Sequence, residues 1–213
     1  MGMDRLIETK SIEIDGYKIV FDQNEGDGPT IILVHGITTY RFIWKKLIPL
    51  FPDTYNVIAV DLLGCGDSDK PLDVSYSIKA HAGRLKTFVD KLDIKRFHLV
   101  GHDVGGGVSQ IFAVNHGEML ESLTLLNSVA YDFWPVQPII AMRTPILKQL
   151  AMATLDLGMF RVIVNRGLFD HKNLTDKLMD DFWHPMRSRS GRKAFLHFAK
   201  CLDNNDLLEI ESQ

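Results

Sequence analysis

Cysteine and long apolar runs are both scarce in this sequence of 213 residues. The two cysteines, Cys65 and Cys201, are far apart and match neither a metal-binding nor a disulfide spacing. This scarcity favours a reducing compartment, so we expect a cytoplasmic protein. No apolar stretch is long enough to cross a bilayer, and the first residues lack the apolar core of a signal peptide. We therefore expect no association with a membrane.

A strong excess of one charge is also missing. Lys and Arg total 24, Asp and Glu total 27, and the formal net charge is −3. That balance gives no electrostatic reason to expect a nucleic-acid partner. Apolar residues make up 46% of the chain, so it can bury a substantial core. The composition indicates a globular protein, and a homodimer is compatible with it.

Short apolar strands alternate with amphipathic helices in the first 130 residues. A hairpin over residues 7–23 turns at Asp15-Gly16, a favoured two-residue turn. Apolar runs predict buried strands at 30–34, 57–60, 97–100 and 123–126, and helices are expected at 40–51, 78–92 and 104–114. This alternation predicts an α/β fold with a mostly parallel sheet and helices on both faces.

Beyond residue 131 the sequence reads as helices alone, most clearly at 147–164 and 193–202. We therefore expect residues 1–130 to form an α/β core and residues 131–213 to form a helical cap, or lid.

The most informative motif lies where the strand at 97–100 meets the next helix. There Gly101-His102-Asp103-Val104-Gly105 has the form of a nucleophile elbow, a tight turn that lifts one side chain above the sheet edge. The flanking glycines fit, because a Cβ atom at either position would clash with the turn. Taken alone, the motif is equally compatible with an aspartate that merely caps the helix N-terminus.

Two further motifs follow strands of the same sheet and favour the elbow. His35-Gly36-Ile37 follows the strand at 30–34, where this architecture supplies one backbone N–H of an oxyanion hole. The second N–H comes from the residue after the nucleophile, so the predicted donors are Ile37 and Val104. The third motif, Asp-x-x-Gly-x-Gly-x-Ser over 61–68, follows the strand at 57–60. All three lie at carboxyl ends of strands, where open α/β sheets bind ligands.

These three motifs, in this order, resemble the α/β-hydrolase superfamily. Within it, Gly-His-Asp at the elbow resembles the epoxide hydrolase and haloalkane dehalogenase branch. The resemblance is close through residue 128 and looser beyond it. It implies an α/β-hydrolase core with a helical lid, Asp103 as the nucleophile and no metal or other cofactor. His102 is expected to pack beside the elbow without a catalytic role.

A carboxylate nucleophile suits an electrophilic carbon. Aspartate, with a reference pKa of about 3.9, is ionised at neutral pH and needs no base to attack. Attack on an epoxide or a haloalkane leaves an alkyl ester on the enzyme. Water activated by a histidine then hydrolyses that ester, and the oxyanion lies against the two backbone N–H groups. The sequence thus predicts a hydrolase acting on a small hydrophobic epoxide- or haloalkane-type substrate.

The chain departs from this branch at several positions. Val104 and Ile37 stand where dehalogenases carry Trp and often Asn to hold the halide, and no tyrosine follows Tyr131. Tyr131 and Trp134 are the predicted substrate-binding residues at the lid entrance.

The family also places a further pair of strands after the lid, with the catalytic histidine in a loop beyond them. No histidine of this chain occupies that position, so we expect a fragment truncated before the last strands. The alternative is a non-catalytic ligand-binding or interaction protein on the same scaffold, or an inactive fragment.

Overall fold

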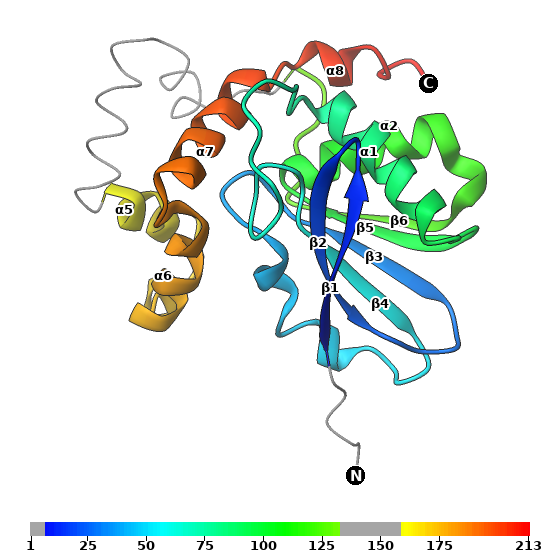
Figure 1. Cartoon of the computed structure of the whole chain (residues 1–213), viewed down its shortest axis with the longest axis horizontal. Coiled ribbons are helices and arrows are strands. Elements are labelled where there is room, and N and C mark those ends of the chain that lie inside the picture. The colour runs from blue at the N-terminus through cyan, green and yellow to red at the C-terminus, as the bar shows by residue number, and fades with distance from the viewer. Residues whose placement is uncertain (1–6, 133–158) are drawn as a thin grey trace.

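The computed structural model describes residues 7–132 and 159–213. Its centre is a six-stranded sheet with strand order β1-β2-β4-β3-β5-β6 (Figure 1). The strands are β1 (Glu8–Ile14), β2 (Tyr17–Asn24), β3 (Thr30–Val34), β4 (Asn56–Val60), β5 (Phe97–His102) and β6 (Leu120–Leu126). The four from β3 to β6 are parallel, and β1 and β2 are antiparallel at one edge. The predicted mostly parallel α/β sheet is confirmed.

The predicted hairpin is formed by β1 and β2. Asp15 and Gly16 connect them with φ angles of 54° and 82°. Two consecutive positive φ angles define the turn type that matches the twist of paired strands, and Asp-Gly adopts it readily.

The three central strands end level with one another. Val34 at the end of β3 pairs with Val60 of β4 on one side and with Gly101 of β5 on the other. The loops that carry the three sequence motifs therefore start from the same edge of the sheet, which brings them together in space.

Alternate residues of the central strands pack on opposite faces of the sheet, as the pleat requires. Ile32 and Ile58 belong to the large core covered by the helices α1 (Ile78–Lys91) and α2 (Val104–His116). Ile31 and Val57 face a smaller core on the other side. That second face is covered by the short 3₁₀ helices η1 (Arg41–Trp44) and η2 (Ile48–Leu50).

The single helix predicted over 40–51 is wrong. Pro49 lies inside that stretch, and in a continuous α-helix its ring would clash with the carbonyl of residue 45 and would remove a hydrogen bond. The chain instead forms two separate 3₁₀ turns, which place Trp44 and Ile48 against the sheet. Among the described residues, α-helices that pack against the sheet therefore lie on one face.

The C-terminal segment from 159 to 213 is helical, as predicted. It contains α5 (Met159–Arg166), η4 (His171–Asn173), α6 (Asp176–Trp183), η5 (His184–Met186), α7 (Arg189–Cys201) and α8 (Asn205–Leu208). The predicted helix at 193–202 begins earlier, at a Ser188 cap whose hydroxyl accepts the Gly191 N–H at 2.9 Å. Of the helix predicted at 147–164, residues 147–158 lie outside the described residues. No helix in the described part of the chain is long and apolar enough to cross a membrane.

The last helices pack against the sheet domain. Phe198 of α7 packs edge-to-face on Tyr76, and His197 makes a 2.7 Å hydrogen bond to the Val74 carbonyl. Phe198, Ala199 and Leu202 are all buried in the same apolar cluster as α1 and α2. Figure 1 shows α7 and α8 running along one side of the sheet domain.

The outer edge at β6 exposes apolar side chains, and we expect the 213-residue chain to self-associate there. Leu123 and Leu125 are 36% and 41% exposed, and the strand pairs only with β5 in the described structure. An unpaired apolar edge strand is a template for another chain. Leu123→Lys combined with Leu125→Lys should lower the weight-average mass in sedimentation at high concentration. Leu50→Lys, at a leucine 78% exposed elsewhere, is the matched control. A wild-type chain that stays monomeric throughout would contradict this expectation.

Candidate active site

Asp103 stands at the junction of β5 and α2 in a strained backbone conformation. Its φ and ψ angles are 55° and −123°, which a residue with a side chain rarely adopts. The two glycines of the motif make the junction tight. A Cβ atom on Gly101 would lie 2.5 Å from the Ser109 Oγ, and one on Gly105 would lie 2.4 Å from the His35 carbonyl oxygen. The start of α2 therefore lies directly against the end of β3, as a nucleophile elbow requires.

The Asp103 carboxylate does not cap the helix that it precedes. Its side chain makes no capping hydrogen bond to the first turn of α2, so the capping alternative is wrong. Instead Oδ1 accepts the Ile37 N–H at 3.0 Å, across to the loop after β3. Oδ2 has no hydrogen-bond partner among residues 7–132 and 159–213. One oxygen of a half-buried carboxylate is thus held while the other is free.

Hydrogen bonds to the backbone of the preceding residue, Gly36, fix the orientation of the Ile37 N–H. The Gly36 carbonyl accepts from the His35 Nδ1 at 2.7 Å and from the Thr39 hydroxyl at 3.1 Å. The Gly36 N–H donates to the same hydroxyl at 3.1 Å. A Cβ atom on Gly36 would lie 2.3 Å from the Asp103 Oδ1, so only glycine allows this approach.

His35 connects the loop after β3 with the loop after β4. It is fully buried, and its Nε2 accepts the Leu62 N–H at 3.0 Å while its Nδ1 faces the Gly36 carbonyl. Nδ1 must therefore carry the hydrogen, because one nitrogen meets a donor and the other an acceptor. Burial lowers the pKa of His35 to about 4. A neutral imidazole with both nitrogens engaged has a structural role and is not a general base.

The third sequence motif, over residues 61–68, provides two carboxylates that bind the Arg41 guanidinium. Arg41 bonds to Asp61, to Asp22 at 2.9 Å and to Asp67 at 2.8 Å. Burial raises the pKa of Asp61 to about 6, and the Arg41 guanidinium opposes that rise. Ser68 closes the loop by accepting the N–H of a β2 residue and donating to the Asp61 carbonyl, both at 2.9 Å. Sequence reasoning recognised this motif but gave Arg41 no role, and no local signal pointed to it.

The structure describes three of the other residues considered in the sequence analysis, Val104, Tyr131 and His102. Val104 is buried at the first position of α2, where a backbone N–H has no acceptor within the helix. Tyr131 is 55% exposed with a φ angle of 50°, and Trp134 lies outside the described residues. His102 packs edge-to-face near Trp44 of η1. In the described ranges no histidine hydrogen-bonds to Asp103, and no cluster of His, Cys, Asp or Glu could hold a metal ion.

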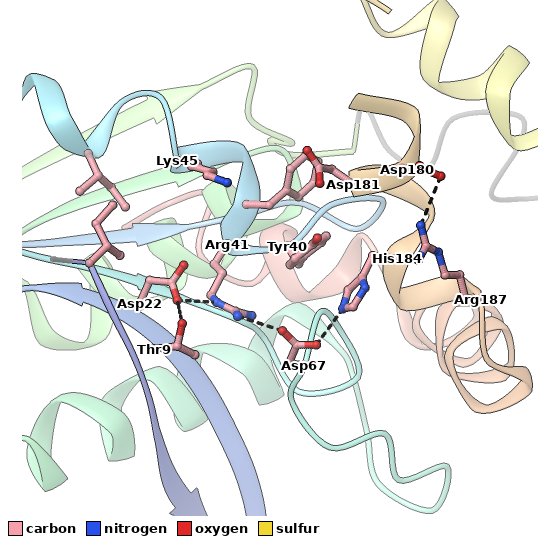
Figure 2. Close-up of a pocket in the computed structure, with 13 residues that line it drawn as sticks. Thr9, Asp22, Tyr40, Arg41, Lys45, Asp67, Asp180, Asp181, His184 and Arg187 are labelled. Atoms are coloured by element: carbon pink, nitrogen blue, oxygen red, sulfur yellow. Dashed lines mark hydrogen bonds and ion pairs between the residues drawn. The ribbon is translucent and has the colours of Figure 1, made fainter. Parts of the chain in front are cut away.

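A cavity of about 460 Å³ lies between η1 and the helices α6 and η5 (Figure 2). Its lining includes Tyr40, Arg41, Lys45, Asp181 and His184, but not Asp103 or either predicted oxyanion donor. Sequence reasoning missed it, because its two walls are far apart along the chain.

Protonation of His35 should make stability depend on pH. In the unfolded chain this histidine has an ordinary pKa of 6.5, and in the folded protein about 4. Between these values the unfolded chain binds a proton that the folded protein excludes, so the free energy of unfolding falls as the pH falls from about 6.5 towards 4, by up to about 3 kcal/mol. Urea unfolding over this range measures it.

His35→Gln is the control, because all other titrating groups, Asp61 included, are common to both proteins. The variant should show a shallower fall in the free energy of unfolding on acidification. Equal pH slopes for the two proteins would show that His35 is not buried and neutral.

Comparisons with known proteins agree with the geometry. A family model described as the alpha/beta hydrolase fold matches residues 29–179, which is more than half of the chain. The chain is 35% identical over 108 residues to a fluoroacetate dehalogenase of Burkholderia sp, an alignment covering 49% of this chain and 36% of the relative. It is 36% identical over 112 residues to haloalkane dehalogenase 2 of Mycobacterium tuberculosis, covering 53% and 38%.

The solved structure of the epoxide hydrolase CorEH has the same fold. It matches with a TM-score of 0.81 at 19% identity, over 96% of this chain and 77% of that one. The alignments span little more than a third of the length of the two curated relatives. The chain belongs to the alpha/beta hydrolase fold family.

Proposed function

We propose that this chain is the nucleophile-bearing part of a cofactor-free hydrolase in which Asp103 attacks an electrophilic carbon. The observation that carries the proposal is the unequal state of the two carboxylate oxygens. Oδ1 is held by the Ile37 N–H at 3.0 Å, and Oδ2 has no partner in the described part of the chain. Oδ2 is not one of the fully buried polar atoms of the described residues, so a substrate carbon can reach it.

The two oxygens then have separate tasks. Oδ2 attacks the carbon, and either an epoxide C–O bond or a carbon–halogen bond breaks, giving an alkoxide or a halide. The product is an ester with Oδ2 as its bridging oxygen and Oδ1 as its carbonyl oxygen. When water attacks that carbonyl, the negative charge develops on Oδ1. The Ile37 N–H is already at hydrogen-bond distance from this atom, and Val104 supplies the second donor.

The substrate class follows from the nucleophile and its surroundings. Ile37 and Val104 offer the site backbone N–H groups, while their buried side chains are apolar. This favours a small hydrophobic molecule with a reactive sp³ carbon, of the epoxide or haloalkane type. The names of the relatives point to the same chemistry. We propose residues 1–130 as the core and 131–213 as the cap, with Tyr131 and Trp134 at the substrate entrance.

A non-catalytic binding protein on the same scaffold is the second candidate. It is favoured by the absence, among the described residues, of a histidine bonded to Asp103. His35, whose nitrogens both face backbone groups, is unable to activate water. Both candidates share the fold, so only a test of covalent chemistry separates them.

The test is covalent labelling followed by peptide mass spectrometry. We expect incubation with styrene oxide or n-butyl bromide to add the epoxide or the butyl group to Asp103. In this chain, without a base to activate water, the ester should accumulate. In a longer form of the protein that contains such a base, the ester should be hydrolysed to a diol or an alcohol. Asp103→Asn should abolish both label and product, because the amide is a far weaker nucleophile. Asp132→Asn, at an exposed carboxylate, is the matched control.

Two results would refute the hydrolase proposal. Label on a residue other than Asp103 would show that another side chain is the nucleophile. A folded protein that acquires no label and forms no product from either reagent would favour the binding protein.

A further inference from the structure

The cavity between η1 and α6 is separate from the proposed chemistry. The walls come from β1 and β2, from η1 and from the helices α6 and η5. Neither Asp103 nor Ile37 lines it. At about 460 Å³ it falls within the range of roughly 300 to 1,000 Å³ typical of small-molecule sites. It is therefore large enough for a ligand that the hydrolase mechanism does not use.

Most charged groups of the wall already neutralise one another. Arg41 is bonded to Asp22 and Asp67, as Figure 2 shows. His184 also bonds to Asp67, with Nε2 2.9 Å from the Asp67 Oδ1. These interactions join the core to η5. Because the four side chains already bind one another, they have little charge left with which to bind a ligand.

Arg187 and Asp180 form a second neutral pair, at 3.2 Å. They lie at the side of the cavity formed by α6 and η5 (Figure 2).

Two lining groups of opposite charge and one hydroxyl take no part in these ion pairs. Lys45 at the end of η1 and Asp181 on α6 both line the cavity, and neither has an ion-pair or hydrogen-bond partner among the side chains of the described residues. Tyr40 lies between the same walls (Figure 2), and its hydroxyl has no hydrogen-bond partner among the described residues. Burial raises the pKa of Tyr40, and the Asp181 carboxylate adds to that rise.

We propose that this cavity binds a small zwitterion, with its carboxylate at Lys45 and its ammonium group at Asp181. The Tyr40 hydroxyl would accept from the ammonium group, and Phe42 and Ile48 offer apolar surface to the chain between the two charges. Such a ligand spans from η1 to α6, so its binding holds the C-terminal helices against the core.

Ligands of a single charge fit the same walls less well. A polyanion would meet four lining carboxylates, those of Asp22, Asp67, Asp180 and Asp181. A metal ion would find no cluster of suitable ligands in the described ranges. A monocation would leave Lys45 without a partner and close to a second positive charge. Charges of both signs on one ligand remove this conflict, since each then meets an unpaired group of opposite sign.

The probes are 4-aminobutanoate, 5-aminopentanoate and 6-aminohexanoate, which separate the two charges by increasing distances. Binding to the protein is measured by isothermal titration calorimetry at low salt. At least one member should bind about fivefold or more tightly than hexanoate and hexylammonium, which carry one charge each. Raising the ionic strength should weaken binding, because the contacts are ion pairs at a solvent-accessible site.

Substitutions at the two unpaired charges locate the ligand. Lys45→Met and Asp181→Asn should each weaken zwitterion binding about fivefold. The Lys45→Met protein should then bind the zwitterion about as well as hexylammonium, and the Asp181→Asn protein about as well as hexanoate. Lys46→Met, at an exposed lysine outside the cavity, should bind like the wild type. Asp103→Asn should also bind like the wild type, so failure of the hydrolase proposal leaves this one standing.

The proposal is overturned if no amino acid of the series binds more tightly than the singly charged analogues. It is equally overturned if folded Lys45→Met and Asp181→Asn proteins bind the zwitterion as the wild type does.

Discussion

One hydrogen bond, from the Ile37 amide to the Asp103 Oδ1, is the contact on which the rest of the site depends. It forms because β3 and β5 are neighbours in register, so the loops that follow them start level. It also requires Gly36, where a Cβ atom would occupy the space of the carboxylate oxygen. The backbone at residue 103 is strained in this arrangement, in which the second oxygen has no partner among the described residues.

The support beneath this contact consists of polar groups that satisfy one another. His35 holds the loop of the amide donor to the loop after β4, and Arg41 joins one carboxylate of β2 to two carboxylates of the loop after β4. Buried polar networks of this kind are rigid when every member is paired. Asp67 extends the network to His184, so the same ions that support the core also hold the C-terminal helices in place. Positioning of the nucleophile and docking of these helices are thereby linked.

The sequence predicted the sheet and the elbow because their signals are local. Runs such as 30–34 and 97–100 are apolar throughout, and glycines two residues on either side of Asp103 indicate a tight turn. The helix expected at 40–51 was wrong, because Pro49 and packing against the sheet outweigh its periodicity. The role of Arg41 and the placement of Lys45 and Asp181 at one cavity were not predictable, because the residues brought together come from distant segments of the chain. The proposed roles of Tyr131 and Trp134 stay predictions.

The central claim is that Oδ2 of Asp103 attacks the substrate and Oδ1 becomes the carbonyl oxygen of the ester. A crystal structure of the protein after reaction with a small epoxide tests this claim most directly. The account predicts an ester whose bridging oxygen is the free Oδ2 and whose carbonyl oxygen accepts hydrogen bonds from the Ile37 and Val104 amides. An ester formed through the oxygen that Ile37 holds, or a carbonyl turned away from both amides, would contradict it.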